Sequence, residues 1–87
     1  MTNRDISGTM SDYKPVSCEA HSLYEIAVMQ RTPALVCWQE NSEIREARLI
    51  PLDVETKNRE EFLIAEDSDQ QKLRIRLDRI LSFVPER

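Results

Sequence analysis

The hydrophobic and polar residues of this chain alternate most regularly near its C-terminal end. Between Gln71 and Arg79, the apolar residues Leu73, Ile75 and Leu77 are separated by charged residues. A period of two is typical of a β-strand that has one apolar face and one charged face. We therefore predict a strand here, and we treat it as the fourth strand of a sheet.

The residues on either side of this segment predict two further strands. Glu61–Glu66 is the third, and Asp67–Gln70 forms a four-residue loop of the length common in hairpins. Pairing Glu66 with Gln71 then sets a register with two apolar core pairs and one outward acid–base pair: Ile64 with Leu73, Phe62 with Ile75, and Glu61 with Arg76. After a bend at Asp78–Arg79, Ile80–Val84 is the fifth strand, which Pro85 stops.

The first half of the chain predicts a leader and then a helix. Residues 1–12 are polar and lack periodicity, which indicates a disordered leader before a single domain over residues 13–87. In the helix from Ser17 to Gln30, one side carries Leu23, Ile26, Ala27 and Gln30. Ser17 can cap the first turn, and Ser22-x-x-Glu25 is a second possible capping box.

The middle of the chain predicts the first two strands. Ala34–Glu40 is a short apolar strand, and Asn41–Ser42 makes the turn after it. Ile44–Pro51 could be helical by propensity, but its position after a hairpin-type turn favours a strand. We interpret Leu52–Arg59 as a polar connection. The fold class is therefore α+β, mainly β: an N-terminal helix over one end of about five antiparallel strands in a strongly bent sheet or open barrel.

Composition narrows the classes of function. The net charge is -4, which disfavours direct binding to nucleic acid. Because no apolar run approaches the roughly 18 residues of a membrane span, and no secretory signal is visible, we expect a cytoplasmic protein without a membrane partner. Cys18 and Cys37 are expected to be free thiols. Gly8, the single glycine, lies outside the folded part and excludes a phosphate-binding glycine loop there.

Candidate chemistry is sparse. His21 and Glu25 are spaced i, i+4, but two ligands are too few for a zinc site. The lone histidine also lacks a catalytic set, so we predict a non-enzymatic protein with no metal or cofactor. Lys72, Arg74 and Arg76 form a basic stripe, for which a salt-bridged surface is favoured over an RNA-binding one. Trp38 is interpreted as a core residue rather than a base-stacking platform.

Two motifs point to a known family. The first is Tyr13-x-Pro15-Val16-x-Cys18-Glu19, followed by Glu25-Ile26-Ala27. The second is Glu61–Glu66 leading to Leu73-x-Ile75-x-Leu77-Asp78-x-Ile80-x-Ser82-Phe83. Together they resemble the Rho-binding antiterminator (Rof) family from Tyr13 to Phe83. The family helix commonly opens with several acids and an aromatic residue, where this chain has Glu19-Ala20-His21-Ser22.

The resemblance implies an Sm-like fold related to that of the RNA chaperone Hfq. It also implies a non-enzymatic protein that binds transcription termination factor Rho and blocks its primary RNA-binding site. We expect the protein to be a monomer. The contacts with Rho are implied on the helix and on the loop before the central strand: Glu19, His21, Ser22, Glu25, Lys57, Asn58 and Arg59. Two alternatives remain open, a small Sm-like RNA-binding regulator using Lys72, Arg74 and Arg76, and a different protein partner.

Overall fold

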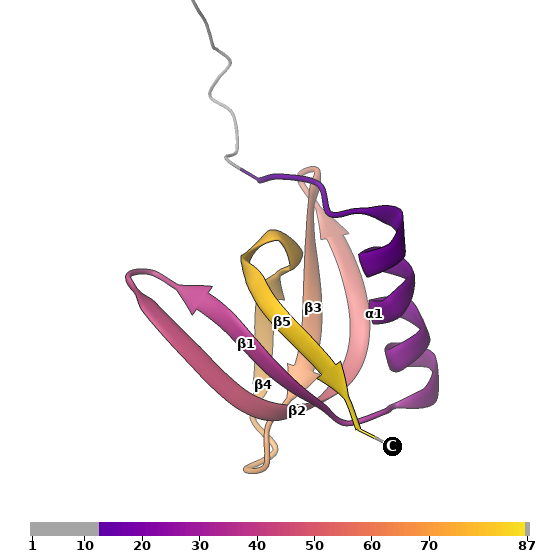
Figure 1. The fold of residues 1–87 in the computed structure, drawn as a ribbon, viewed down its shortest axis with the longest axis vertical. Coiled ribbons are helices and arrows are strands. Elements are labelled where there is room, and N and C mark those ends of the chain that lie inside the picture. Colours follow the sequence, from indigo (N-terminus) through magenta and orange to yellow (C-terminus); the bar gives the residue numbers. More distant parts are fainter. Residues whose placement is uncertain (1–12, 87) are drawn as a thin grey trace, which may run out of the picture.

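The computed structural model of the chain describes residues 13–86, so the leader predicted for residues 1–12 lies outside the described part. One helix precedes five antiparallel strands, which confirms the predicted α+β layout (Figure 1). The elements in chain order are α1 (Cys18–Gln30), β1 (Ala34–Glu40), β2 (Glu43–Lys57), β3 (Glu60–Glu66), β4 (Lys72–Arg76), the 3₁₀ helix η2 (Leu77–Arg79) and β5 (Ile80–Pro85).

The strands form one open sheet in the order β4-β3-β2-β1-β5. Strand β2 joins its two halves, because β2 pairs with β1 up to Leu49 and with β3 from Ile50 onward. The predicted polar connection over Leu52–Arg59 is therefore wrong, since β2 continues to Lys57. Pro51 sits where the β2–β3 register shifts. A bulge of this kind tolerates a proline and bends the strand, so the residue that was expected to end β2 lies inside it instead.

The register between β3 and β4 differs by one residue from the predicted one. Leu63 lies opposite Ile75, and Phe62 lies opposite Arg76. The cause is the loop, in which the Asp67 backbone N–H donates to the Gln71 carbonyl at 3.0 Å. The Asp67 carboxylate also accepts from the backbone N–H of Gln71 at 2.9 Å. Gln71 thus closes a five-residue loop, and a one-residue slip exchanges the two faces of a strand.

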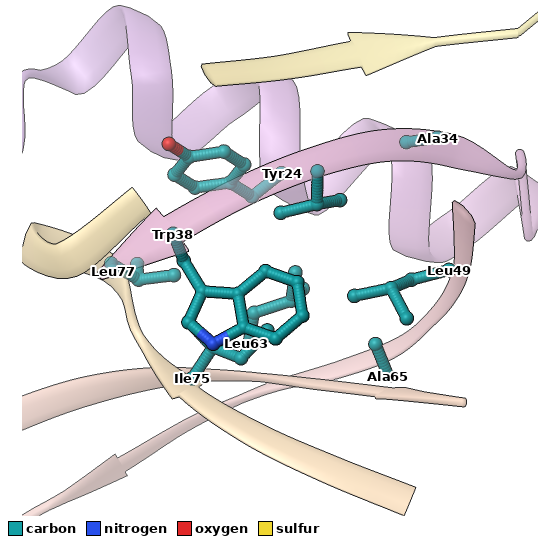
Figure 2. Close-up of a cluster of buried hydrophobic side chains, with 9 residues drawn as sticks. Tyr24, Ala34, Trp38, Leu49, Leu63, Ala65, Ile75 and Leu77 are labelled. Carbon is teal, nitrogen blue, oxygen red and sulfur yellow. The ribbon is translucent and has the colours of Figure 1, made fainter. Parts of the chain in front are cut away.

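The core lies inside the bend of the sheet and is closed on one side by α1. Figure 2 shows Tyr24 of α1 facing side chains from the strands, among them Trp38 and Leu63. Trp38 is only 4% exposed, which confirms its predicted place in the core. Its indole Nε1 donates to the Glu40 carboxylate at 3.1 Å, so the buried ring keeps its polar group satisfied.

Helix α1 buries a different side from the one that the sequence pattern predicts. Tyr24 and Ala27 are buried against the sheet, whereas Leu23 is 37% and Ile26 52% exposed. The Tyr24 ring packs edge-on against Phe83 of β5 at a centroid distance of 5.0 Å. Burying a tyrosine ring removes a large area from water, and an alanine lets the helix approach the sheet closely. Part of the apolar side of the helix therefore faces outward.

Candidate functional site

The start of α1 is fixed by an N-capping residue. The backbone N–H of Ala20 donates to the Ser17 hydroxyl at 3.1 Å, and Ser17 has an extended backbone. Such a side-chain bond satisfies one of the free N–H groups at a helix start. Ser17 is therefore the N-cap, and the alternative start at Ser22 is not used. Glu19 lies in the first turn, where the helix dipole favours a negative charge.

His21 connects this end of α1 to the sheet by binding Glu61 of β3. Its Nε2 lies 2.8 Å from Oε2 of Glu61 in β3, and its Nδ1 lies 3.5 Å from Oε1 of Glu25. The hydrogen bond with Glu61 raises the pKa of His21 above its usual 6.5, and the negative charges of Glu61 and Glu25 add to this effect against the opposing effect of burial. Only the imidazolium can donate from both ring nitrogens. The geometry therefore favours a positively charged histidine between two carboxylates.

The segment before the helix joins the same group of side chains. The Tyr13 hydroxyl donates to Oε1 of Glu61 at 3.2 Å, and the Arg76 guanidinium lies 5.5 Å from the centre of the Tyr13 ring. Burial, and then the charge of Glu61, raise the pKa of Tyr13 to about 12. The next residue, Lys14, donates its backbone N–H to the Asp78 carboxylate at 3.0 Å. Residues 13 and 14 are thereby tied to β3 and to η2.

The predicted loop positions form the tight turn between β2 and β3. Lys57 pairs with Glu60, so Asn58 and Arg59 are the two loop residues. Both have a positive φ, 53° and 67°, as the type I′ turns that favour two-residue hairpins require. Arg59 adopts this conformation although it has a Cβ, which costs about 1 kcal/mol. Asn58 and Arg59 therefore have the backbone conformation of a tight two-residue hairpin turn.

The structure brings the predicted helix and loop positions to the same end of the molecule. Glu61, which binds His21, is the second residue of β3 and is separated from the β2–β3 turn by Glu60 alone. Figure 1 shows that this turn and the start of α1 lie at one end of the fold. Glu19, Ser22 and all three turn residues are exposed. We call the surface formed by Glu19, His21, Ser22, Glu25 and Lys57–Arg59 the helix–turn surface.

Three further side chains belong to this region and were missed from the sequence. The predicted register pairs Glu61 with Arg76, and the sequence predicts no side-chain contact for Tyr13 or Asp78. Arg76 instead binds Asp78, with its Nη2 2.7 Å from Oδ2. A pairing between residues 40 positions apart, such as His21 with Glu61, has no local sequence signal. The unusual density of complementary polar side chains at Tyr13, His21 and Glu61 becomes visible only in the fold.

The helix also presents apolar side chains to solvent. Leu23, Ile26 and Met29 recur every three residues and are exposed, Met29 to 81%. Together with Pro33 and Pro85, two of them line a groove of about 570 Å³ between α1 and the end of β5. A contiguous exposed apolar patch is characteristic of a protein-binding surface. It lies next to the acidic residues of the helix–turn surface, because both occupy the solvent side of α1.

The basic stripe on β4 is largely engaged within the protein. The Arg74 Nη2 lies 3.0 Å from a Glu55 carboxylate oxygen, and its guanidinium covers the Phe62 ring at 4.0 Å. Arg76 binds Asp78. The prediction of a salt-bridged face is confirmed, but the partners are Glu55 and Asp78 rather than Glu61. Lys72 is exposed and makes no ion pair within residues 13–86.

Cys18 and Cys37 are free thiols, as predicted. Within residues 13–86, no three His, Cys, Asp or Glu side chains are grouped so that they could hold a metal ion. In the same part of the chain, no helix is long and apolar enough to cross a bilayer. Comparison of the chain with protein-family models and with curated proteins finds no match.

Proposed function

We propose that this protein inhibits transcription termination factor Rho by binding it through the helix–turn surface and blocking its primary RNA-binding site. The identity of the partner comes from the resemblance of the Tyr13–Ala27 and Glu61–Phe83 motifs to the Rof family. The observation that carries the proposal is the hydrogen bond between His21 and Glu61 at 2.8 Å. It holds the helix against the strand that begins at the β2–β3 turn, so both implied contact segments can meet one partner.

The helix–turn surface is mixed in charge, because it contains His21, Lys57 and Arg59 as well as two acids, and it is the carboxylates of Glu19 and Glu25 that suit a basic partner. Glu19 and Glu25 are exposed on α1, and the chain as a whole carries -4. A site that binds RNA phosphates is rich in Lys and Arg, so acidic side chains at its mouth would be complementary to it. Such contacts accelerate association and weaken as salt screens them. Lys57 and Arg59, at the edge of the surface, would meet acidic or polar groups of the partner.

The exposed apolar side chains supply the second part of the interface. Leu23 and Ile26 are on the solvent side of α1 within one turn of Glu25. Buried apolar groups contribute roughly 25 cal/mol per Å² of surface removed from water, whereas charged groups at a rim mainly set orientation and rate. An inhibitor of this design would act by occupying a surface in the bacterial cytoplasm, without chemistry of its own.

A Rho-dependent termination assay with purified components tests this proposal. The wild-type protein should increase read-through, and Glu25→Lys should lower the affinity for Rho about tenfold or more, because a repulsive contact replaces an attractive one. Glu19→Lys should behave similarly. Glu46→Lys is the matched control, since Glu46 is exposed on the β1–β2 hairpin, which projects away from α1 in Figure 1.

Circular dichroism of each variant separates loss of binding from loss of folding. Folded Glu19→Lys and Glu25→Lys proteins that still inhibit Rho like the wild type would refute the assignment of the surface. A wild-type protein that neither binds Rho nor increases read-through would refute the proposed function itself.

The alternative function, RNA regulation through Lys72, Arg74 and Arg76, has less support. Two of the three cations already bind carboxylates, and the neighbouring Phe62 ring is covered by Arg74. An RNA gel shift run beside the Rho capture distinguishes the two functions. Retention of RNA without capture of Rho would favour the alternative.

A further inference from the structure

The outer edge of β4 lies in a groove of about 480 Å³. All five residues of β4 line this groove, and Trp38–Asn41, at the end of β1, form its other wall. Successive side chains of a strand point to opposite faces, so a hollow that touches all five must follow the edge of the strand. In the sheet order, β4 is an end strand that pairs only with β3 among the described strands.

The two faces of β4 offer different chemistry along this edge. On the inner face, Leu73 and Ile75 lie beside Trp38 of the core. On the outer face, the groove is lined by Lys72, Arg74 and Arg76, with Arg79 close to its end. Glu40 is the only carboxylate among the lining residues, against four cations. Arg74 and Arg76 also bind Glu55 and Asp78 outside the lining, and with these two acids counted the cations still exceed the carboxylates by one.

We propose that this edge accepts an extended acidic segment of a partner polypeptide, which adds to the sheet as a strand beside β4. An end strand offers backbone N–H and C=O groups to another chain, and strand addition of this kind is a recurring mode of peptide recognition. Because the strand faces alternate, the segment would alternate as well. Its acidic side chains would meet Lys72 directly, and would meet Arg74 and Arg76 in competition with Glu55 and Asp78. Its apolar side chains would lie beside Leu73 and Ile75.

The observations favour a polypeptide over single-stranded RNA. Binding of unpaired bases relies on open aromatic faces for stacking. Here the Phe62 ring lies under the Arg74 guanidinium at 4.0 Å, and Trp38 is only 4% exposed. A second copy of this chain is also disfavoured as the occupant. Its other end strand, β5, is uncharged from Ile80 to Pro85 and offers nothing to the cations of the groove.

The test uses the full chain and a peptide of the length of β4 in which glutamate alternates with valine. Binding is measured by titration calorimetry, and the protection of β4 amides is measured by hydrogen exchange. We expect binding at low salt together with new protection at β4. A peptide of the same composition with its glutamates and valines in separate blocks should bind at least about fivefold more weakly, because its charges and apolar groups cannot both be matched.

Lys72→Glu is the informative variant, because Lys72 is exposed and has no ion pair to lose within residues 13–86. It should weaken binding of the alternating peptide about fivefold or more. Arg31→Glu makes the same change of charge at an exposed residue outside the groove and should change this peptide's affinity by less than about twofold.

Four results would overturn the proposal. They are equal binding of both peptides, absence of new protection at β4, retention of oligouridylate RNA without peptide binding, and self-association of the protein through β4. None of these results bears on inhibition of Rho, which is assigned to the helix–turn surface.

Discussion

The contact between His21 and Glu61 predicts a specific dependence of stability on pH. In the folded protein the pKa of His21 is raised, so the imidazolium is favoured by folding. The resulting stabilisation is fully present below the unfolded-state pKa of about 6.5 and is lost as the pH rises through the folded-state pKa. The free energy of unfolding should therefore fall as the pH rises from slightly acidic to slightly alkaline.

The structure sets the size of this effect. The His21 and Glu61 side chains are 26% and 27% exposed and meet at 2.8 Å, which places the pair between a surface ion pair and a buried one. Surface pairs contribute about 0–1 kcal/mol and hydrogen bonds to charged groups about 1.5–3 kcal/mol, so we expect about 1 kcal/mol from the charge on His21. In a domain of this size that corresponds to about 4–8 °C in Tm.

Glu61→Gln is the perturbation that tests this reasoning. At about pH 5.5 it should cost about 1 kcal/mol more than at about pH 8, because only the charged histidine requires the carboxylate. A smaller part of the cost, the hydrogen bond from Tyr13, should persist at both values, since the pKa of Tyr13 is about 12. Urea unfolding monitored through Trp38, the only tryptophan, gives both free energies.

Two controls separate the charge on His21 from other contributions. His21→Gln should remove most of the pH dependence, and Glu25→Gln should reduce it less, because Glu25 is half-exposed and 3.5 Å away. As His21 is the single histidine, its NMR titration is unambiguous and should move toward about 6.5 in Glu61→Gln. A cost of Glu61→Gln that stays constant across this pH range would refute the reasoning.

Two further predictions concern stability. Leu63→Ala should cost about 2–5 kcal/mol, because the side chain is fully buried and its loss leaves a cavity; a midpoint of urea unfolding close to that of the wild type would contradict this. Arg59→Gly should stabilise the fold by up to about 1 kcal/mol, because glycine adopts the observed φ of 67° without strain; the measurement is the change in Tm, and a lower Tm would show that the arginine makes a compensating contact.

The chain shows clearly which parts of a fold local patterns can predict. The residues of β1, β3 and β5 were located to within one residue, since each strand is bounded by a turn residue or a proline. The sequence predicts the helix with two possible starts, Ser17 and Ser22, and the structure uses the Ser17 cap. The candidate helix and turn positions came from the family motifs, and the fold places both segments at one end of the molecule.

The errors in the β3–β4 register and in the buried side of α1 share one cause, which is that both faces of these elements carry apolar residues. In β3, Phe62 and Ile64 lie on one face and Leu63 and Ala65 on the other, so the pattern could not choose between two registers. The same holds for α1, where Ile26 and Ala27 are neighbours and only Ala27 is buried. The predicted end of β2 was wrong for a different reason. Pro51 lies at a bulge, and a proline at a bulge does not stop a strand.

The sequence by itself determined the class of this protein, because the period of the apolar residues and the turn residues act locally. Only the tertiary structure decided which faces are buried, since that depends on what packs against them. It also decided that His21 meets Glu61, Tyr13 meets Glu61 and Lys14 meets Asp78. These contacts join residues at least 40 positions apart, and such pairs are adjacent only once the bent sheet and the helix have come together.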